Sequence, residues 1–532
     1  MDSLSNATSL ITSSLSTYTS SLSKTQISKT VDVCKNTLFI QHNCSVLDGD
    51  GTLKDILVDW RDVILNTTDL LTYFTKYKTF LEHVYSIHIF ISDDEETKQS
   101  QIIDSFSQRM ATFIDELFMI CPNATSLTFN SYSSTFFFII PYLSSPSINI
   151  LKLNFSKYVY GHYLDKISKL KNVLYGLNNL KVVYLDIACV PSILETNCQN
   201  LINSMLEYLS GKLKNRFILN TKFNKDDIKY VKNFLKYAHL YDVNIGLQGT
   251  LNKNDSFFSF PSFSEKNDEI FETKNIVELN ISVNDLDGWT KLFDELPNFE
   301  NLKVFKVSLN SNSLKYDSMN NEESVLSRYF NNKRLKNISN LDEFYFQLSR
   351  FFYFNGTYEE KEKFYILVDL IVDGMISNLN SKLKVMYLDG IPNLNDEMKV
   401  KLNTNCPNIT SIHLGPINSI AVDFIENLEK LKFVQIVGNF KINIPSNVDI
   451  LIFNSGDFHE HDDYKMIGEM NSTETDTYFR DKYNRNFNVS IKNCDDYHFR
   501  YAVLCDNILT WNAYLDKLRK FDNAFILMEE DS

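Results

Sequence analysis

One short pattern recurs along the chain and constrains its fold more than any other feature. An apolar residue is followed by two others, an apolar residue, one other and a third apolar residue. The copies read VYSIHI (84–89), ATSLTF (124–129), INILKL (148–153), LKVVYL (180–185), IVELNI (276–281), LKVFKV (302–307), LDEFYF (341–346), LKVMYL (383–388), ITSIHL (409–414), LKFVQI (431–436) and VDILIF (448–453). Weaker copies lie at 216–220 and 240–245. One such hexapeptide is a common accident, but this many copies indicate a repeated structural unit.

Segments with helical spacing of their apolar residues lie between many of the copies. They cover residues 102–120, 201–213, 226–240, 285–296 and 419–431. A short strand that alternates with a helix predicts an α/β fold with parallel strands. Apart from the stretch that holds the weaker copies, successive copies begin 17 to 42 residues apart, and the longer spacings imply inserted loops.

The pattern resembles the L-x-x-L-x-L strand signature of leucine-rich repeats. In such repeats a short strand alternates inward and outward residues, and a following helix or loop closes the coil. The resemblance implies an α/β leucine-rich-repeat solenoid, a horseshoe with a parallel inner sheet and outer helices, with irregular repeats and inserted loops. An ordinary α/β domain with parallel strands is the alternative.

Two copies open with the residues CPN, at Cys121 and Cys406. They are similar to the cysteine-containing repeats of F-box leucine-rich-repeat proteins, which are substrate receptors of ubiquitin ligases. The similarity covers roughly residues 80–460 and is degenerate. The Asn that usually follows the strand is present only at Asn284, Asn310 and Asn439.

The resemblance and the composition together suggest four regions. Residues 1–30 form a Ser/Thr-rich disordered lead-in, and residues 31–80 a helical N-terminal cap or a diverged F-box-like region. Residues 81–456 form the solenoid, and residues 457–532 a polar loop with a C-terminal cap. The F-box itself is not recognisable, because the motif usually begins with Leu-Pro and no proline precedes Pro122. Residues 52–74 fit either helices of a cap or a diverged F-box.

Charge and composition narrow the partners and the compartment. The net charge of −14 argues against nucleic acid or an anionic membrane as the main partner. No stretch approaches the ~18 apolar residues that a membrane span needs. The first 30 residues do not resemble a secretory signal, and the eight cysteines contain no C-x-x-C pair, which fits a reducing compartment. We expect a cytoplasmic or nuclear monomer without a cofactor.

A short acidic motif, SVLDGDGT, places Asp48 and Asp50 two residues apart. It resembles the first motif of the haloacid-dehalogenase phosphatases, which would make Asp48 a nucleophile and Asp50 an acid/base near Mg²⁺. The preceding residues HNCSVL are barely apolar, whereas that family needs a buried strand there. Asp93 and Asp94 follow too soon to supply the family's acidic pair. We interpret the motif as a turn before a helix and keep the phosphatase as a remote alternative.

A second motif, FHEHDD at 458–463, places His459 and His461 beside two aspartates. A metal site would need both imidazoles on one face and a third ligand. The surrounding residues are polar and follow the last copy of the pattern, so we interpret the motif as a solvated loop.

One position of the pattern predicts a surface. The residue between the last two apolar positions points to the concave face, because alternate strand residues face opposite ways. This column reads His88, Thr128, Lys152, Tyr184, Asn280, Lys306, Tyr345, Tyr387, His413, Gln435 and Ile452. Exposed aromatic residues in a row are typical anchors of protein interfaces. We therefore expect Lys152, Tyr184, Lys306, Tyr345, Tyr387, His413 and Gln435 to bind a protein partner.

The function that these observations predict is non-enzymatic protein binding inside the cell. The resemblance implies a substrate receptor or adaptor of an SCF-type ubiquitin ligase. A scaffold or interaction protein unconnected to ubiquitin is the alternative.

Overall fold

The computed structural model describes most of the pattern-bearing part of the chain. The described residues are 37–41, 86–91, 100–131, 136–155, 172–187, 199–212, 215–222, 228–252, 273–311, 338–349, 357–438, 440–454, 489–495 and 498–505, with Leu170 and Leu335. The chain divides into two compact units. Unit 1 is Met1–Thr221 with Lys229–Gly246, and unit 2 is Lys222–Ile228 with Leu247–Ser532.

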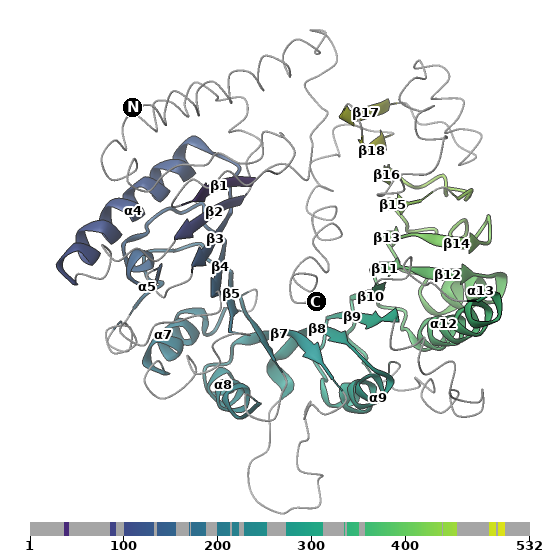
Figure 1. The fold of residues 1–532 in the computed structure, drawn as a ribbon, viewed down its shortest axis with the longest axis horizontal. Coiled ribbons are helices and arrows are strands. Elements are labelled where there is room, and N and C mark those ends of the chain that lie inside the picture. The colour runs from purple at the N-terminus through teal and green to yellow at the C-terminus, as the bar shows by residue number, and fades with distance from the viewer. Residues whose placement is uncertain are drawn as a thin grey trace, which may run out of the picture. The chain divides into compact units, whose positions relative to one another are not determined.

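In unit 1 the strands pair in parallel and in chain order. They are β1 (Thr37–Gln41), β2 (Ser86–Ile91), β3 (Ser126–Ser131), β4 (Ile150–Phe155), β5 (Val182–Asp186) and β6 (Arg216–Lys222). The helical segments are α4 (Ser100–Ile120), α5 (Phe136–Ile139), η4 (Ile140–Tyr142), α7 (Gln199–Leu209) and α8 (Ile228–Leu240). Strand β7 (Asn244–Leu251) crosses the division between the units. The ribbon shows α4, α5, α7 and α8 on one side of their strands (Figure 1).

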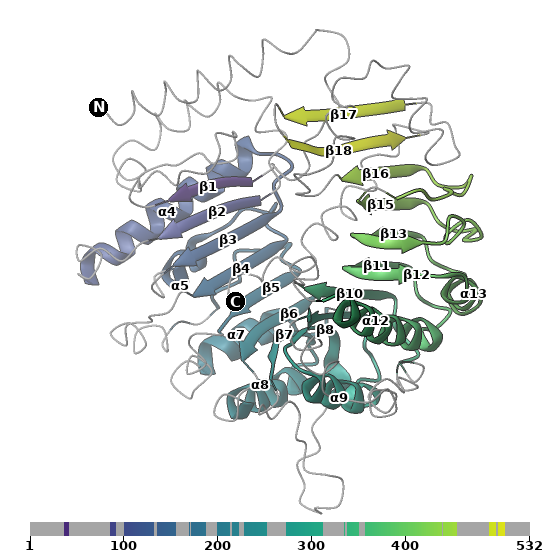
Figure 2. The same ribbon diagram turned by 45° about the vertical axis from the view of Figure 1, so that its right-hand side comes forward.

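In unit 2 a second run of parallel strands again follows chain order. It comprises β8 (Ile276–Val283), β9 (Val304–Asn310), β10 (Glu343–Ser349), β11 (Val385–Asp389), β13 (Ser411–Leu414), β15 (Phe433–Val437) and β16 (Ile450–Asn454). Beyond β16 the hairpin of β18 (His498–Cys505) and β17 (Val489–Asp495) pairs antiparallel, as Figure 2 shows. The reversal of direction ends the parallel run within the region expected to contain the C-terminal cap.

The connections of unit 2 carry the helices and a small second sheet. The helical segments are η7 (Thr273–Asn275), α9 (Leu286–Glu295), η8 (Leu296–Asn298), α12 (Tyr358–Asn378) and α13 (Asp396–Asn405). Strands β12 (Ile391–Leu394) and β14 (Ile417–Ile420) pair in parallel with each other. A tight turn after β11 leads into β12. Gly390 lies there at a φ of +69°, where a Cβ would meet the Leu348 carbonyl oxygen at 2.5 Å, so the turn requires glycine.

Most strand predictions from the sequence are confirmed. Every copy of the pattern from 84–89 to 448–453 overlaps a strand, and the weaker copies at 216–220 and 240–245 overlap β6 and β7. The fold is therefore α/β with a large parallel sheet. Strand β1 lies within residues 31–80, where the sequence suggested helices only. The rest of residues 31–80, including the segment 52–74, lies outside the described part.

Helix predictions were less accurate than strand predictions. Four segments correspond to α4, α7, α8 and α9, but the helix expected over 419–431 is wrong. Its first residues belong to β14, and turns follow. Those turns are closed by hydrogen bonds three residues apart, such as Phe424 N–H to the Ala421 carbonyl. Helices α12 and α13 were not predicted.

The core lies between each set of strands and its helices. Buried aromatic side chains connect the layers, with the Phe129 and Phe136 rings stacked at 5.8 Å in unit 1. In unit 2 the ring of Phe293 on α9 lies 5.9 Å from the ring of Phe305 on β9. Among the described helices, none is both long and apolar enough to cross a membrane.

Candidate functional site

The two faces of the unit 2 sheet are distinguished by what packs on them. Phe305 on β9 lies 5.9 Å from Phe293 of α9, and Phe346 on β10 lies 6.1 Å from Trp289, both measured between ring centroids. Successive strand residues point to opposite faces. Lys306 and Tyr345, the neighbours of these phenylalanines, therefore point away from the helices.

The residues expected to form a column do stand in register. In unit 2 the backbone partners across neighbouring strands run in order from Asn280 through Lys306, Tyr345, Tyr387, His413 and Gln435 to Ile452. In unit 1 the order is His88, Thr128, Lys152 and Tyr184, followed by Ile218. We call the unit 2 set the central column. This part of the prediction is confirmed.

Side chains of the central column contact one another from strand to strand. The ammonium group of Lys306 lies 3.7 Å from a carboxylate oxygen of Glu278 and 5.1 Å from the centre of the Tyr345 ring. The Tyr345 and Tyr387 rings are 5.7 Å apart. Tyr387 stacks on His413 at 3.9 Å with an interplanar angle of 4°. The chain of contacts is therefore continuous across these strands.

Hydrogen bonds at the ends of the side chains fix the orientation of the rings. The Tyr345 hydroxyl donates to Glu343 at 2.9 Å, and the Tyr387 hydroxyl donates to Asp389 at 3.0 Å. Gln347 also donates to Asp389, at 3.3 Å. A buried tyrosine needs such a partner, because an unsatisfied hydroxyl costs free energy. The two acids flank the column and hold its tyrosines in place.

The expected exposure of this column is wrong. Tyr345 is 0% exposed, Tyr387 6% and His413 4%. Gln435 and, in unit 1, Tyr184 are also buried. Stacking on neighbouring strands removes part of each ring from water, and parallel sheets are usually covered on both faces. The structure leaves Lys152 and Lys306 half-buried.

Burial also sets the protonation state of the two histidines. It lowers the pKa of His413 to about 4, although the hydrogen bond to Gln435, at 3.0 Å, acts to raise it. Burial, with the nearby charge of Lys152, lowers the pKa of His88 to about 3. Both imidazoles are therefore neutral at pH 7. A neutral ring suits the stack on Tyr387, since a buried charge would carry a desolvation cost.

Other sites that the sequence singled out fall largely outside this part of the structure. Asp48, Asp50 and the FHEHDD motif lie outside the described residues. Within the described ranges, no three His, Cys, Asp or Glu side chains lie close enough to hold a metal ion. Cys121 and Cys406 are buried free thiols, and burial raises the pKa of each to about 12. A thiol of this kind is a packing residue and a poor nucleophile at neutral pH.

An asparagine ladder is the feature that sequence reasoning missed. In several copies the residue directly before the first apolar position is Asn. Its side-chain amide donates to a backbone carbonyl that lies 16 to 40 residues earlier in the chain. The bonds are Asn179 to Pro146, Asn301 to Lys274, Asn340 to Glu300, Asn408 to Ser381 and Asn447 to Leu428, Glu429 and Leu431. The signal was present in the sequence as an Asn directly before the hexapeptide. These side chains satisfy backbone carbonyls at the turns into the five strands concerned.

Comparison with known proteins identifies the family to which the chain belongs. A family model described as a domain of unknown function, DUF8346, matches residues 50–518, which is most of the chain. No curated protein matches the sequence.

Proposed function

We propose that this protein, which belongs to the family of the domain of unknown function DUF8346, is a non-enzymatic protein-binding solenoid of the leucine-rich-repeat horseshoe type. The observation that carries the proposal is the central column, whose side chains continue from strand to strand on the sheet face opposite α9. Strands hold side chains more rigidly than loops do, and rigid placement favours recognition. The binding surface of the proposal is this face.

Buried and half-buried residues have different roles in this proposal. Tyr345, Tyr387 and His413 form a packed floor, because they are almost fully removed from water. The contacts to a partner come from half-buried residues on and beside the column: Lys306, Glu343, Gln347 and Asp389. These groups carry both signs of charge, so they favour a partner with complementary charges over a purely apolar one. The floor keeps their geometry fixed.

Within this class we propose first a substrate receptor or adaptor of an SCF-type ubiquitin ligase, cytoplasmic or nuclear. The support is the resemblance of the two CPN-containing copies to cysteine-containing repeats. Cys121 and Cys406 are both buried, and each lies five residues before the first residue of its strand, Ser126 or Ser411. A scaffold without a ligase connection is the second candidate, and it fits the same surface.

The test is affinity capture of the tagged full chain, with quantitative mass spectrometry. The informative variant exchanges an ion pair, Glu278→Lys with Lys306→Glu. It keeps the pair and its net charge but places a carboxylate at position 306, the more exposed of the two positions. The matched control is Lys303→Glu, an exposed change directly before β9. We expect the exchanged pair to reduce capture of specific partners about tenfold or more and the control to retain them.

The identity of the captured proteins separates the two candidates. An F-box adaptor and a cullin among the partners of the wild type support the ligase role, and their absence among specific partners favours the scaffold. Equal capture by the exchanged pair and the wild type, with unchanged thermal melts, would move the binding site away from this face.

A further inference from the structure

The outer side of α12 carries a regular seam that the core does not use. Helix α12 begins with a capping box in which Thr357 and Glu360 bond reciprocally. Its inner side is buried through residues such as Phe364, Leu367 and Ile371. On the opposite side, residues recur at alternating intervals of four and three: Glu359, Lys363, Ile366, Leu370, Asp373 and Ser377. We call these six residues the outer seam.

Apolar residues at the centre of the outer seam are exposed. Ile366 is 51% exposed and Leu370 38%. The outward side of a surface helix is normally polar, and alternating spacings of three and four are the spacing of a coiled-coil seam. The flanking charges are accessible too, because the Lys363 side chain is 57% exposed and the Asp373 side chain 32%, although each already has a partner in its own chain, Glu359 for Lys363 and Lys401 for Asp373. The seam therefore has an apolar centre between a cation and an anion.

The outer seam is complementary to a second copy of itself that runs in the opposite direction. In an antiparallel pair with a twofold axis beside the middle of α12, Ile366 of each copy faces Leu370 of the other. The same register places Lys363 opposite Asp373. A twofold interface needs this reciprocity, in which residue i contacts residue j and j contacts i. A parallel pairing would instead place Lys363 against Lys363 and Asp373 against Asp373.

From this reciprocity we propose that a second copy of this chain docks on the outer seam of α12 in antiparallel orientation. The proposal replaces the monomer expected from the sequence alone, and it is independent of the binding face proposed above. A single helix pair buries less area than a large obligate interface, so the dimer is weak, with a dissociation constant in the micromolar range.

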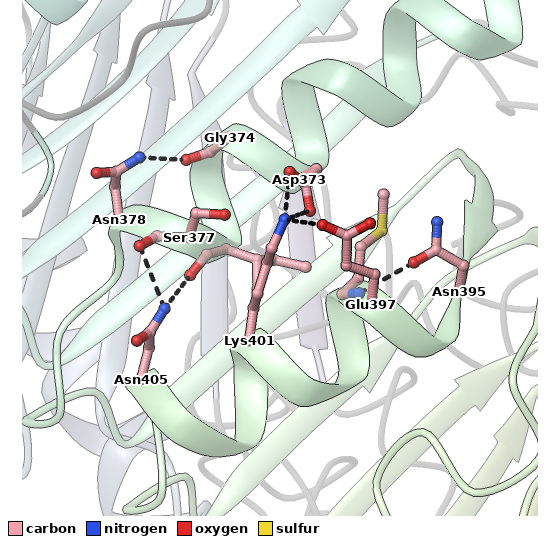
Figure 3. A network of polar contacts seen from close by, with 10 residues as sticks. Asp373, Gly374, Ser377, Asn378, Asn395, Glu397, Lys401 and Asn405 are labelled. Atoms are coloured by element: carbon pink, nitrogen blue, oxygen red, sulfur yellow. Dashed lines mark hydrogen bonds and ion pairs between the residues drawn. The ribbon is translucent and has the colours of Figure 1, made fainter.

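Helix α13 braces the seam, as Figure 3 shows. The Lys401 ammonium donates to both carboxylate oxygens of Asp373, at 2.7 and 2.8 Å, and lies 2.7 Å from Glu397. Asn405 donates to the carbonyls of Ile376 and Ser377, both at 3.2 Å. These bonds fix α12 against α13 before association, which lowers the entropy cost of docking. A carboxylate has lone pairs for a second cation, so Asp373 can accept Lys363 of the second copy as well.

The experiment measures self-association of the full chain by sedimentation equilibrium from about 1 to about 100 µM. Ile366→Lys and Leu370→Glu are tested separately, because each places a charge opposite an apolar side chain of the second copy. We expect the dissociation constant of self-association to be at least tenfold higher for each variant than for the wild type. Val422→Glu is the matched control: Val422 is 43% exposed and lies outside the seam. The control should associate like the wild type.

Mixing the two variants tests the register itself. In an equimolar mixture, Lys at 366 of one copy faces Glu at 370 of the other, and the remaining contact is the native one between Leu370 and Ile366. We expect the two variants to form a heterodimer at concentrations at which neither variant dimerises alone. Their thermal melts should stay unchanged, because both positions are exposed. A wild type that stays monomeric throughout, variants that associate normally, or a mixture without heterodimers would each overturn the proposal.

Discussion

The unit 2 sheet has two faces that are both closely packed but chemically different. On the side of α9 it carries Phe305, Phe346 and other apolar residues that contact the helix through rings. On the opposite side, Tyr345, Tyr387 and His413 are also buried, but their rings contact one another, and the two tyrosine hydroxyls donate to Glu343 and Asp389. An apolar layer depends on volume alone, whereas a polar aromatic layer also depends on orientation. The polar layer therefore specifies which strand lies beside which.

The largest expected effect comes from a charge on the helix side. Leu388 on β11 is 1% exposed, so Leu388→Asp places a carboxylate without a partner in the core. The cost is several kcal/mol, comparable with the net stability of a domain. We expect loss of cooperative unfolding in a thermal melt. The control Val400→Asp, at a position that is 60% exposed, should melt like the wild type.

Truncation on the opposite face should also destabilise the protein, though less. Because Tyr345 is fully buried and its ring packs beside Tyr387, Tyr345→Ala should lower the free energy of unfolding by about 3 kcal/mol or more. Tyr345→Phe keeps the ring and removes the hydroxyl that donates to Glu343, at a cost of about 1 kcal/mol. Denaturant titration measures both. An unchanged midpoint for Tyr345→Ala would mean that this face is open.

Acid should weaken the polar face through His413. Its pKa is about 4 in the folded protein, below the ordinary value of 6.5, so the unfolded chain binds more protons between these values. The contribution of His413 to the free energy of unfolding is therefore complete above pH 6.5. It is lost as the pH falls towards 4, by up to roughly 3 kcal/mol. Unfolding free energies measured across this window should fall less steeply for His413→Gln.

A carboxyl group on α12 has the opposite effect on the free energy of unfolding over a similar pH range. Burial raises the pKa of Asp369 to about 6, although its hydrogen bond to Asn393 opposes the shift. Its contribution favours the folded state at low pH and is lost as the pH rises through 6. Asp369→Asn should therefore steepen the loss of stability on acidification, the reverse of the effect of His413→Gln. Equal slopes for the two variants would contradict these assignments.

Strand order and register could be predicted from the sequence because the side chains of a strand alternate with a period of two. Each copy of the hexapeptide assigns its own residues to the two faces, so the pattern alone aligns Tyr345, Tyr387 and His413. The pattern says which face a residue occupies but not what lies over that face. Burial of the column could for this reason not be predicted.

Helix α12 shows a second limit. Amphipathic spacing identified α9, but Ile366 and Leu370 place apolar residues on the outward side of α12 and obscure its helical period. The residues proposed to form an interface between two copies thus concealed the helix from pattern analysis. The segment 419–431 shows the opposite error, a predicted helix that does not form. Its apolar residues have helical spacing, and Phe424, Ile425 and Leu428 are buried, but they reach the core from turns.

A double-mutant cycle across neighbouring strands tests the repeat architecture most directly. Successive copies of the pattern form adjacent strands in the register that stacks Tyr387 on His413. Tyr387→Leu and His413→Leu, alone and combined, should show a coupling energy of about 1 kcal/mol in denaturant titrations. The matched pair Tyr345→Leu and Gln435→Leu, whose strands are separated by two others, should show additive effects. Coupling in the distant pair and none between Tyr387 and His413 would contradict the register.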